Sequence, residues 1–207
     1  MFIIGLTGGI SCGKSAVAFE LKKNCGAITF DVDEETRKLL QPGEEFFNDY
    51  VKHFGEQIIY ENGQIDKKIV REIIFHDEDE RQWINSVTHP ILLNRTRQFL
   101  VDCQERGENL VVLEIPLLFE AGWEDLFDEI WAVYLPRELQ LQRLIRRDRI
   151  TPEQAIARIN SQMPVKEICS RADVVVKNHN SFSDLQKQIL KAMNGRWIFG
   201  NAQQENF

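Results

Sequence analysis

Residues 8–15 have the sequence GGISCGKS, and this stretch decides the fold. It fits the pattern G-x-x-x-x-G-K-[ST], a glycine-rich loop that joins a strand to a helix and binds phosphate groups. An apolar run at 2–6 precedes the stretch, and a helical pattern from about 14 to 23 follows it, with Gly26 just beyond. Because this is the context that the motif requires, the sequence predicts a nucleoside triphosphate site rather than a glycine-rich turn with a surface lysine.

Each part of the loop has a separate chemical task. Gly8 and Gly13 let the backbone come close to a phosphate and adopt positive φ. Backbone N–H groups of the loop and of the helix N-terminus point toward the anion. Lys14 is expected to reach the β- and γ-phosphates, and the Ser15 hydroxyl to bind Mg²⁺. The predicted nucleotide-binding residues in this stretch are Gly8, Gly9, Ser11, Cys12, Gly13, Lys14, Ser15 and Ala16.

The rest of the chain predicts an α/β fold. Short apolar runs with helical segments between them are typical of a parallel sheet covered on both faces. The runs are 2–6, 27–30, 110–115, 130–135 and 172–176. One further helix is predicted to begin at Pro90, with Leu92, Thr96, Phe99 and Cys103 on its apolar side and Gly107 at its end. A capping box at 183–186 predicts the last helix.

Two segments interrupt this alternation. Residues 34–87 are polar and predict several short helices, which we expect to form an insertion over the sheet rather than a separate domain. Residues 137–163 are a second helical excursion, rich in arginine, and are expected to form a lid. The remaining core would span 1–33 and 88–200, followed by a short polar tail at 201–207.

Composition and charge exclude several classes of protein. The 207 residues are 43% hydrophobic and 28% charged, as in an ordinary globular protein, and the net charge is −7. A negative chain is not expected to bind nucleic acid or anionic membranes, and no apolar run is long enough to span a bilayer. The four cysteines are scattered, which favours reduced thiols in a cytoplasmic protein over a metal site or disulfides. The oligomeric state cannot be deduced.

A phosphate-binding loop alone does not distinguish a kinase from a GTPase or a motor. The chain has no N-K-x-D motif, which GTPases use to read the base, and its size suits a small-molecule kinase. Such an enzyme needs a carboxylate near the acceptor hydroxyl. Asp33, with Asp31 beside it, follows the second predicted strand, where parallel sheets place their ligands. Capping of the next helix is an equally good explanation for either aspartate.

The proposed lid would supply positive charge to the transferred phosphoryl group. Residues 137–149 contain five arginines and two acidic residues. Arg143 and Arg147 are four residues apart and share a helix face. Guanidinium groups suit phosphate oxygens and stabilise charge during phosphoryl transfer. A solvated helix face with ion pairs would explain the same pattern if the phosphate-binding loop were absent.

A larger set of residues, spread from about Phe2 to Leu190, matches one family of small-molecule kinases. The set comprises Gly5-Leu-Thr-Gly-Gly-Ile10, Gly13-Lys-Ser15, Gly26-Ala27, Asp31, Asp33, Pro42-Gly43, Phe54-Gly55, Gly63, Asp66, His89-Pro90, Ile115-Pro-Leu-Leu-Phe-Glu120, Gln140, Arg143, Arg147, Arg158-Ile159, Gln162, Ala172-Asp173 and Asn178. On these residues the sequence resembles the dephospho-coenzyme A kinase family.

The resemblance implies a five-stranded parallel P-loop core, a helical region for the coenzyme A moiety and a lid. The implied reaction transfers the γ-phosphoryl group of ATP to the 3′-hydroxyl of dephospho-CoA, the last step of coenzyme A biosynthesis. Asp33 matches the acceptor-side carboxylate, and Lys14 and Ser15 match the phosphate and Mg²⁺ positions. Arg143 and Arg147 match lid arginines near the phosphates, and Asn178 matches a position near the adenine of ATP.

The chain departs from the family pattern at several positions. Ser11-Cys12 replace the usual Gly-Ser, and Ala16 replaces a common Thr. A residue other than glycine at position 11 adds strain if its φ is positive. Glu114 stands where Asp is commoner, and Lys67 replaces an Arg. None of these changes removes a group that the chemistry needs, although Cys12 at a helix N-terminus predicts an oxidation-sensitive thiol.

Two other functions remain open on the sequence alone. One is a P-loop kinase for a different acceptor, such as a nucleotide or shikimate. The other is a regulatory module that binds ATP without catalysis, for which Ser11 and Glu114 would be the telling changes. Acceptor-dependent release of ADP would separate both from the kinase that the resemblance implies.

Overall fold

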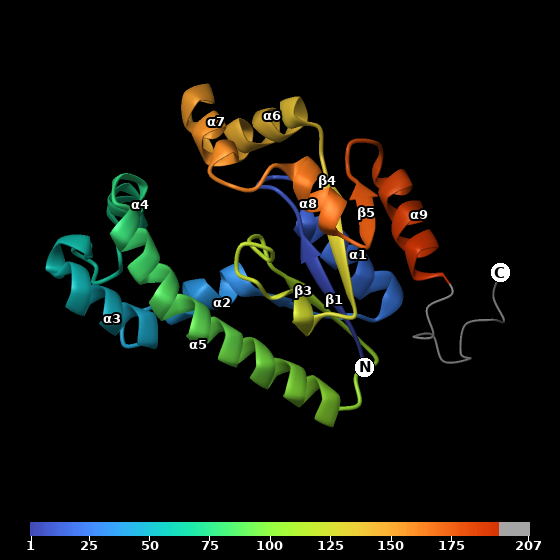
Figure 1. Cartoon of the computed structure of the whole chain (residues 1–207), viewed down its shortest axis with the longest axis horizontal. Coiled ribbons are helices and arrows are strands. Elements are labelled where there is room, and N and C mark those ends of the chain that lie inside the picture. The colour runs from blue at the N-terminus through green and yellow to red at the C-terminus, as the bar shows by residue number, and fades with distance from the viewer. Residues whose placement is uncertain (195–207) are drawn as a thin grey trace. The chain divides into compact units, whose positions relative to one another are not determined.

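The computed structural model describes residues 1–194 (Figure 1). The predicted polar tail at 201–207 lies outside the described residues. The chain divides into two compact units, one formed by Met1–Asp31 with the chain from Cys103 onward, the other by Val32–Asp102. The second unit is therefore a compact body of its own and larger than the predicted insertion at 34–87, because it includes most of one long helix.

The first unit is built on the predicted parallel sheet. All five expected strands form, within one or two residues of the apolar runs, and their order is β2-β3-β1-β4-β5. Each neighbouring pair is parallel. The strands are β1 (Phe2–Thr7), β2 (Ile28–Asp31), β3 (Leu110–Glu114), β4 (Glu129–Tyr134) and β5 (Val174–Lys177). The α/β prediction is confirmed.

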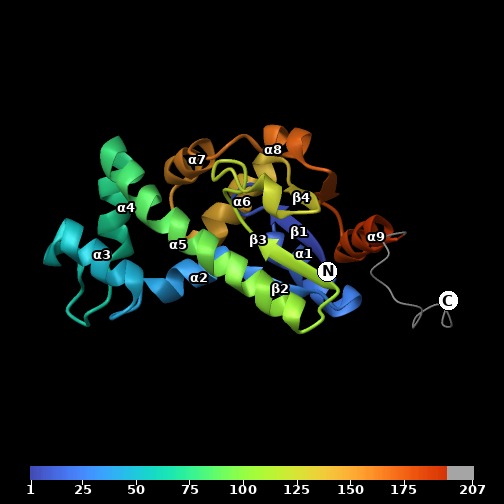
Figure 2. The ribbon, with the colours of Figure 1, turned by 60° about the horizontal axis from the view of Figure 1, so that its bottom comes forward.

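Helices cover this sheet. In the first unit, α1 and α9 pack against each other, and α8 packs on β4; Figure 2 gives a second view of their places. The helices are α1 (Lys14–Cys25), α6 (Arg137–Asp148), α7 (Pro152–Asn160), α8 (Val165–Arg171) and α9 (Phe182–Met193), with a 3-10 turn η2 at Glu124–Leu126. The fully buried side chains Ile4, Val17 and Trp131 belong to the core between sheet and helices.

The ends of two helices show how well the sequence signals predict boundaries. Gly26 ends α1 as expected, with φ 68° and its N–H bonded to the carbonyl of Leu21. The capping box predicted at 183–186 is wrong by two residues. Ser181 caps α9, and its hydroxyl oxygen accepts a hydrogen bond from the N–H of Asp184. Asp184 thus takes the place in the first turn that the prediction gave to Gln186.

The second unit is helical, as predicted. It contains α2 (Val32–Leu39), α3 (Glu45–Phe54), the 3-10 turn η1 (Glu56–Ile58), α4 (Lys67–His76) and most of α5 (Glu78–Glu105). Its aromatic centre includes Tyr50 and Trp83, with ring centroids 5.9 Å apart. His53 stacks on Trp83 at 3.6 Å and forms a 2.6 Å hydrogen bond with Glu80.

Pro90 contradicts the prediction that a helix begins there, because it lies inside the 28-residue helix α5. Proline lacks an N–H donor and costs about 3 kcal/mol in a helix interior. Four buried side chains at four-residue spacing form one stripe that runs through this region: Ile84, Thr88, Leu92 and Thr96. Burial of this stripe favours a continuous helix over a break at Pro90, so His89 also lies within the helix rather than at its cap.

Among the described residues, no helix is both long enough and apolar enough to cross a membrane. The four cysteines are free thiols.

Candidate active site at the phosphate-binding loop

The phosphate-binding loop lies between β1 and α1, where the sequence predicts it. Gly8 and Gly13 have φ values of 142° and 91°, which confirms the positive φ expected for both. Neighbouring atoms also leave little room for a side chain at these two positions. A Cβ atom on Gly8 would lie 2.6 Å from the carbonyl oxygen of Val133, and one on Gly13 would lie 2.1 Å from the Asn178 amide nitrogen. A side chain at Gly8 is blocked by backbone, whereas one at Gly13 would displace the Asn178 amide and be strained by the positive φ.

Lys14 and Ser15 open the helix that follows the loop. The Lys14 ammonium group donates a 2.8 Å hydrogen bond to the carbonyl oxygen of Gly8, so its side chain reaches back across the loop. Ser15 is exposed in the first turn of α1. The N–H of Ala16 bonds to the carbonyl of Gly13 and is thus part of the helix. This geometry leaves one ammonium group and one hydroxyl beside a helix N-terminus that favours anions.

Cys12 lies in surroundings that oppose the reactivity predicted for its thiol. The side chain is fully buried, and burial raises the pKa of its thiol to about 11, although the nearby Lys14 charge opposes the shift. The nucleophilic form of cysteine is the thiolate, so a thiol with this pKa is unreactive near neutral pH. Burial of the side chain argues against the expected oxidation-sensitive thiol, because desolvation outweighs the helix N-terminus.

The arginine-rich excursion at 137–163 folds as α6 and α7 within the first unit. Arg143 lies beside the loop and donates a 3.0 Å hydrogen bond to the carbonyl oxygen of Asn178. Arg147 instead forms an ion pair with Asp148, with Nε 2.7 Å from Oδ1. Asp148 also pairs with Arg158 at 2.6 Å. The structure therefore places one of the two predicted lid arginines at the loop and ties the other to a local ion-pair network.

Asn178 follows β5 and supports the loop directly. Its side-chain amide donates a 2.8 Å hydrogen bond to the carbonyl oxygen of Cys12. No local pattern predicts this contact, since the two residues are 166 positions apart. The arrangement packs Asn178 against Gly13, while its expected place near an adenine stays a prediction.

Two strands on one side of β1 end in a carboxylate: β3 lies beside β1, and β2 lies next to β3. Asp31 and Glu114 are the last residues of β2 and β3 and are partners in the sheet register. Asp33 belongs to the second unit and is the second residue of α2, so it does not occupy the N-cap position that was the alternative to a catalytic role. A carboxylate in a first helical turn still stabilises the helix dipole.

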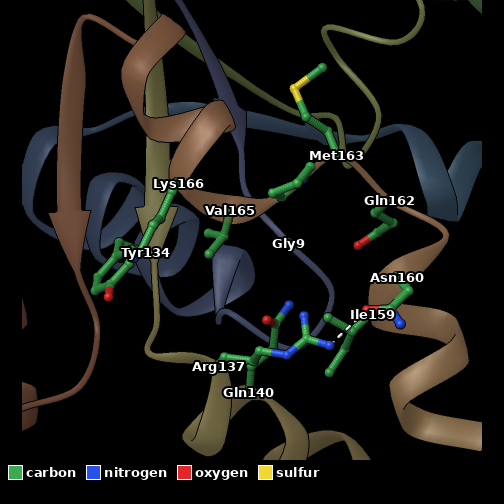
Figure 3. Close-up of a pocket in the computed structure, with 11 residues that line it drawn as sticks. Gly9, Tyr134, Arg137, Gln140, Ile159, Asn160, Gln162, Met163, Val165 and Lys166 are labelled. Carbon is green, nitrogen blue, oxygen red and sulfur yellow. Dashed lines mark hydrogen bonds between the residues drawn. The ribbon is translucent and has the colours of Figure 1, made fainter.

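A cavity of about 380 Å³ borders the loop at Gly9 (Figure 3). Side chains from α6, from the end of α7, from the segment that joins α7 to α8 and from α8 line it, including Gln140 of α6 and Gln162 of the joining segment. Arg137, at the start of α6, donates a 2.7 Å hydrogen bond to the Asn160 side chain across one side of the cavity (Figure 3). The family resemblance includes both glutamines, but an amide side chain has no distinctive spacing that would assign them a role.

Known proteins share this sequence and this fold. A family model described as dephospho-CoA kinase matches residues 2–184. A dephospho-CoA kinase from Carboxydothermus hydrogenoformans is 41% identical over 188 residues, which are 91% of this chain and 91% of that protein.

Two solved structures are similar as well. TT1252 from Thermus thermophilus has a TM-score of 0.77 and 31% identity, covering 93% of this chain and 95% of the other. A dephospho-CoA kinase from Campylobacter jejuni has a TM-score of 0.66 and 28% identity, covering 92% and 94%. The phosphate-binding loop, the parallel sheet and these similarities agree, and the chain belongs to the dephospho-CoA kinase family.

Proposed function

We propose that this protein transfers the γ-phosphoryl group of ATP to the 3′-hydroxyl of the ribose of dephospho-CoA, giving CoA and ADP. The observation that carries the proposal is the family match over residues 2–184, which includes the whole phosphate-binding loop. The protein would act in the cytoplasm at the last step of coenzyme A biosynthesis, a place that suits its four free thiols.

On the ATP side, the chain supplies donors and charge. The loop N–H groups would hold the phosphates, and Lys14 would move its ammonium group from Gly8 to the β- and γ-phosphates. Arg143, beside the loop, would stabilise the charge of the phosphoryl group in transfer. Arg147 would join it after leaving its ion pair with Asp148, which requires the lid to rearrange.

The residues present suit Mg²⁺. Ser15 offers an exposed hydroxyl, and Glu114 offers a carboxylate at the end of a neighbouring strand. Among residues 1–194, no group of three or more His, Cys, Asp or Glu side chains could hold a metal ion alone. That is expected for Mg²⁺, which prefers oxygen ligands and shares its coordination with substrate phosphates and water. When bound, the ion would neutralise charge on the phosphates.

On the acceptor side, Asp33 would orient the 3′-hydroxyl and take its proton. The hydroxyl oxygen forms a bond to the γ-phosphorus, the bond to the bridging oxygen breaks, and ADP leaves with that electron pair. Asp33 is exposed in the first turn of α2. We expect the unit 32–102 to bind the coenzyme A moiety.

The decisive experiment measures ADP release from Mg-ATP with and without dephospho-CoA, with the product identified by mass. Acceptor-dependent release and a product heavier by one phosphoryl group are expected. Release of ADP with shikimate or a nucleotide instead would mean that the protein is a kinase for a different acceptor. ATP binding without release for any acceptor would support a non-catalytic module.

A further inference from the structure

Ile10, in the middle of the phosphate-binding loop, has both of its backbone polar groups bonded to side chains of the lid. Its N–H donates to the Gln162 side-chain oxygen at 2.8 Å, and its carbonyl oxygen accepts from the Gln140 amide nitrogen at 2.8 Å. A backbone N–H can only donate and a carbonyl can only accept, so these contacts fix which end of each amide faces the loop. Gln140 is only 3% exposed, which makes its bond costly to lose.

The Ile10 side chain adds a third attachment. It packs against a small apolar cluster inside the lid, whose buried members are Leu144, Ala155 and Ile159. These residues come from α6 and α7. The lid therefore holds one loop residue through its N–H, its carbonyl and its side chain.

These bonds set the direction in which the neighbouring peptide groups point. In a trans peptide the carbonyl and the N–H point in opposite directions. The Ile10 carbonyl faces Gln140, so the N–H of Ser11 in the same peptide points away from the lid. In the preceding peptide, the Ile10 N–H faces Gln162, and the Gly9 carbonyl accepts a 3.2 Å hydrogen bond from the N–H of Cys12 inside the loop. Backbone N–H groups turned into such a loop are what bind phosphate.

The residue that follows shows why the loop needs this support. Ser11 has a φ of 59°, and its buried hydroxyl has no hydrogen-bond partner. A left-handed conformation is unfavourable for a residue with a side chain, because its Cβ comes too close to the following carbonyl oxygen. A strained conformation persists only where the surroundings fix it, and here the bonds on Ile10 do so.

Gly9 provides room for one of the two amides. A Cβ atom at this position would lie 2.6 Å from the Gln140 amide nitrogen. That nitrogen is the far end of a flexible side chain, so a methyl group would push the amide away rather than disrupt the fold. The Gln140 amide can therefore reach Ile10 only because Gly9 has no side chain.

We propose that Gln140 and Gln162 are positioning residues that hold the Ile10 peptides so that the Ser11 N–H faces the phosphates of a bound nucleoside triphosphate. The proposal rests on the proposed function for the identity of the nucleotide. It assigns the lid a task in preparing the phosphate-binding loop, in addition to the charge that its arginines supply.

Matched substitutions test it because the two glutamines bond in opposite senses. In Gln162→Glu a carboxylate oxygen still accepts from the Ile10 N–H. In Gln140→Glu the donor is lost and a carboxylate faces the Ile10 carbonyl. Both variants add one negative charge in the same region, so each controls for the charge of the other.

The affinity for Mg-ATP is measured calorimetrically at pH 8 without acceptor, with urea unfolding of each variant alongside. We expect Gln140→Glu to weaken binding by about tenfold relative to Gln162→Glu. With dephospho-CoA present, the KM for ATP should rise in the same order, and more than the KM for the acceptor. Equal affinities in the two variants, or a loss of unfolding free energy with unchanged ATP affinity in Gln140→Glu, would overturn the proposal.

A second set of variants, Gly9→Ala and Gln140→Ala, tests the proposal if Gln140→Glu does not fold. Gly9→Ala should weaken ATP binding in the wild-type background but have little further effect in Gln140→Ala, because the displaced amide is already absent. Additive effects would contradict the proposal. Since ATP affinity is measured without acceptor, a protein that binds ATP but does not phosphorylate dephospho-CoA would refute the proposed function and leave this inference testable.

Discussion

Asp31 and Glu114 are register partners at the carboxyl ends of two neighbouring parallel strands, β2 and β3. Partners in a parallel ladder point to the same face of the sheet, so the two carboxylates form a pair next to the strand that leads into the phosphate-binding loop. Glu114 is largely buried, at 9% exposure. The pair therefore places two carboxyl groups at the carboxyl edge of the sheet, the edge at which β1 leads into the loop.

Glu114 should therefore influence how Mg²⁺ is used. We expect Glu114→Gln to raise the Mg²⁺ concentration for half-maximal activity, because a neutral amide is a weaker partner for the ion and its water. Glu114→Asp retains a carboxylate and should stay close to the wild type. Steady-state rates over a Mg²⁺ titration at saturating ATP measure this. An unchanged titration in Glu114→Gln would exclude the residue from the metal environment.

Lys14→Ala should nearly abolish turnover, since it removes both the contact with Gly8 and the charge expected at the phosphates. Lys22→Ala is the matched control, because Lys22 is exposed in the last turn of the same helix. The measurement is kcat/KM for ATP in both variants. Near-normal activity in Lys14→Ala would show that the site has been assigned wrongly.

Asp33→Asn should lower kcat by about 10² or more while the KM for ATP changes little, as expected for loss of a group that takes the acceptor proton. Glu34→Gln, an exposed neighbour in the same helical turn, controls for the lost charge. A normal kcat with a reduced free energy of unfolding would mean that Asp33 only stabilises the start of α2.

Ser11→Gly should stabilise the protein without nucleotide. Glycine adopts a φ of 59° at little cost, and the change also removes the unpaired buried hydroxyl. The expected gain in the free energy of unfolding is about 1 kcal/mol, after the entropy that glycine loses on folding is deducted. Urea denaturation of both forms measures it. A loss of stability would mean that the hydroxyl makes a favourable interaction in the folded protein.

Cys12 should resist alkylation. With a pKa of about 11, only about one thiol in a thousand is ionised at pH 8, and the side chain is also buried. Iodoacetamide at pH 8 should leave activity intact, and the peptide that contains Cys12 should stay unlabelled by mass spectrometry. The same treatment in denaturant provides the control. Loss of activity in step with labelling of Cys12 would refute the burial argument.

Features that depend on neighbouring residues in the sequence were predicted correctly. The five strands followed from apolar runs, and the loop followed from glycines that need positive φ, so both were found from sequence. Two helix starts were predicted wrongly. Pro90 lies inside α5, where a buried stripe of side chains favours a continuous helix. Ser181, rather than Ser183, caps α9.

The parts of the site that depend on distant contacts were not predictable. Gln140 and Ile10 are 130 residues apart, and no pattern in a single sequence links an amide to a particular carbonyl. The burial of Cys12 likewise depends on how β-strands and helices assemble around it. Gln140, Gln162 and Asn178 belong to the family resemblance, but their contacts with the loop could not be deduced from it.

The strand order has a consequence for synthesis of the chain. The central strand β1 pairs with β3 and β4, and Phe2 has its register partner at Leu110. A ribosome that adds about 5–20 residues per second makes Leu110 between about five and twenty seconds after Phe2. For that time the apolar strand β1 lacks both of its native neighbours, so the nascent chain carries an unpaired strand that could aggregate.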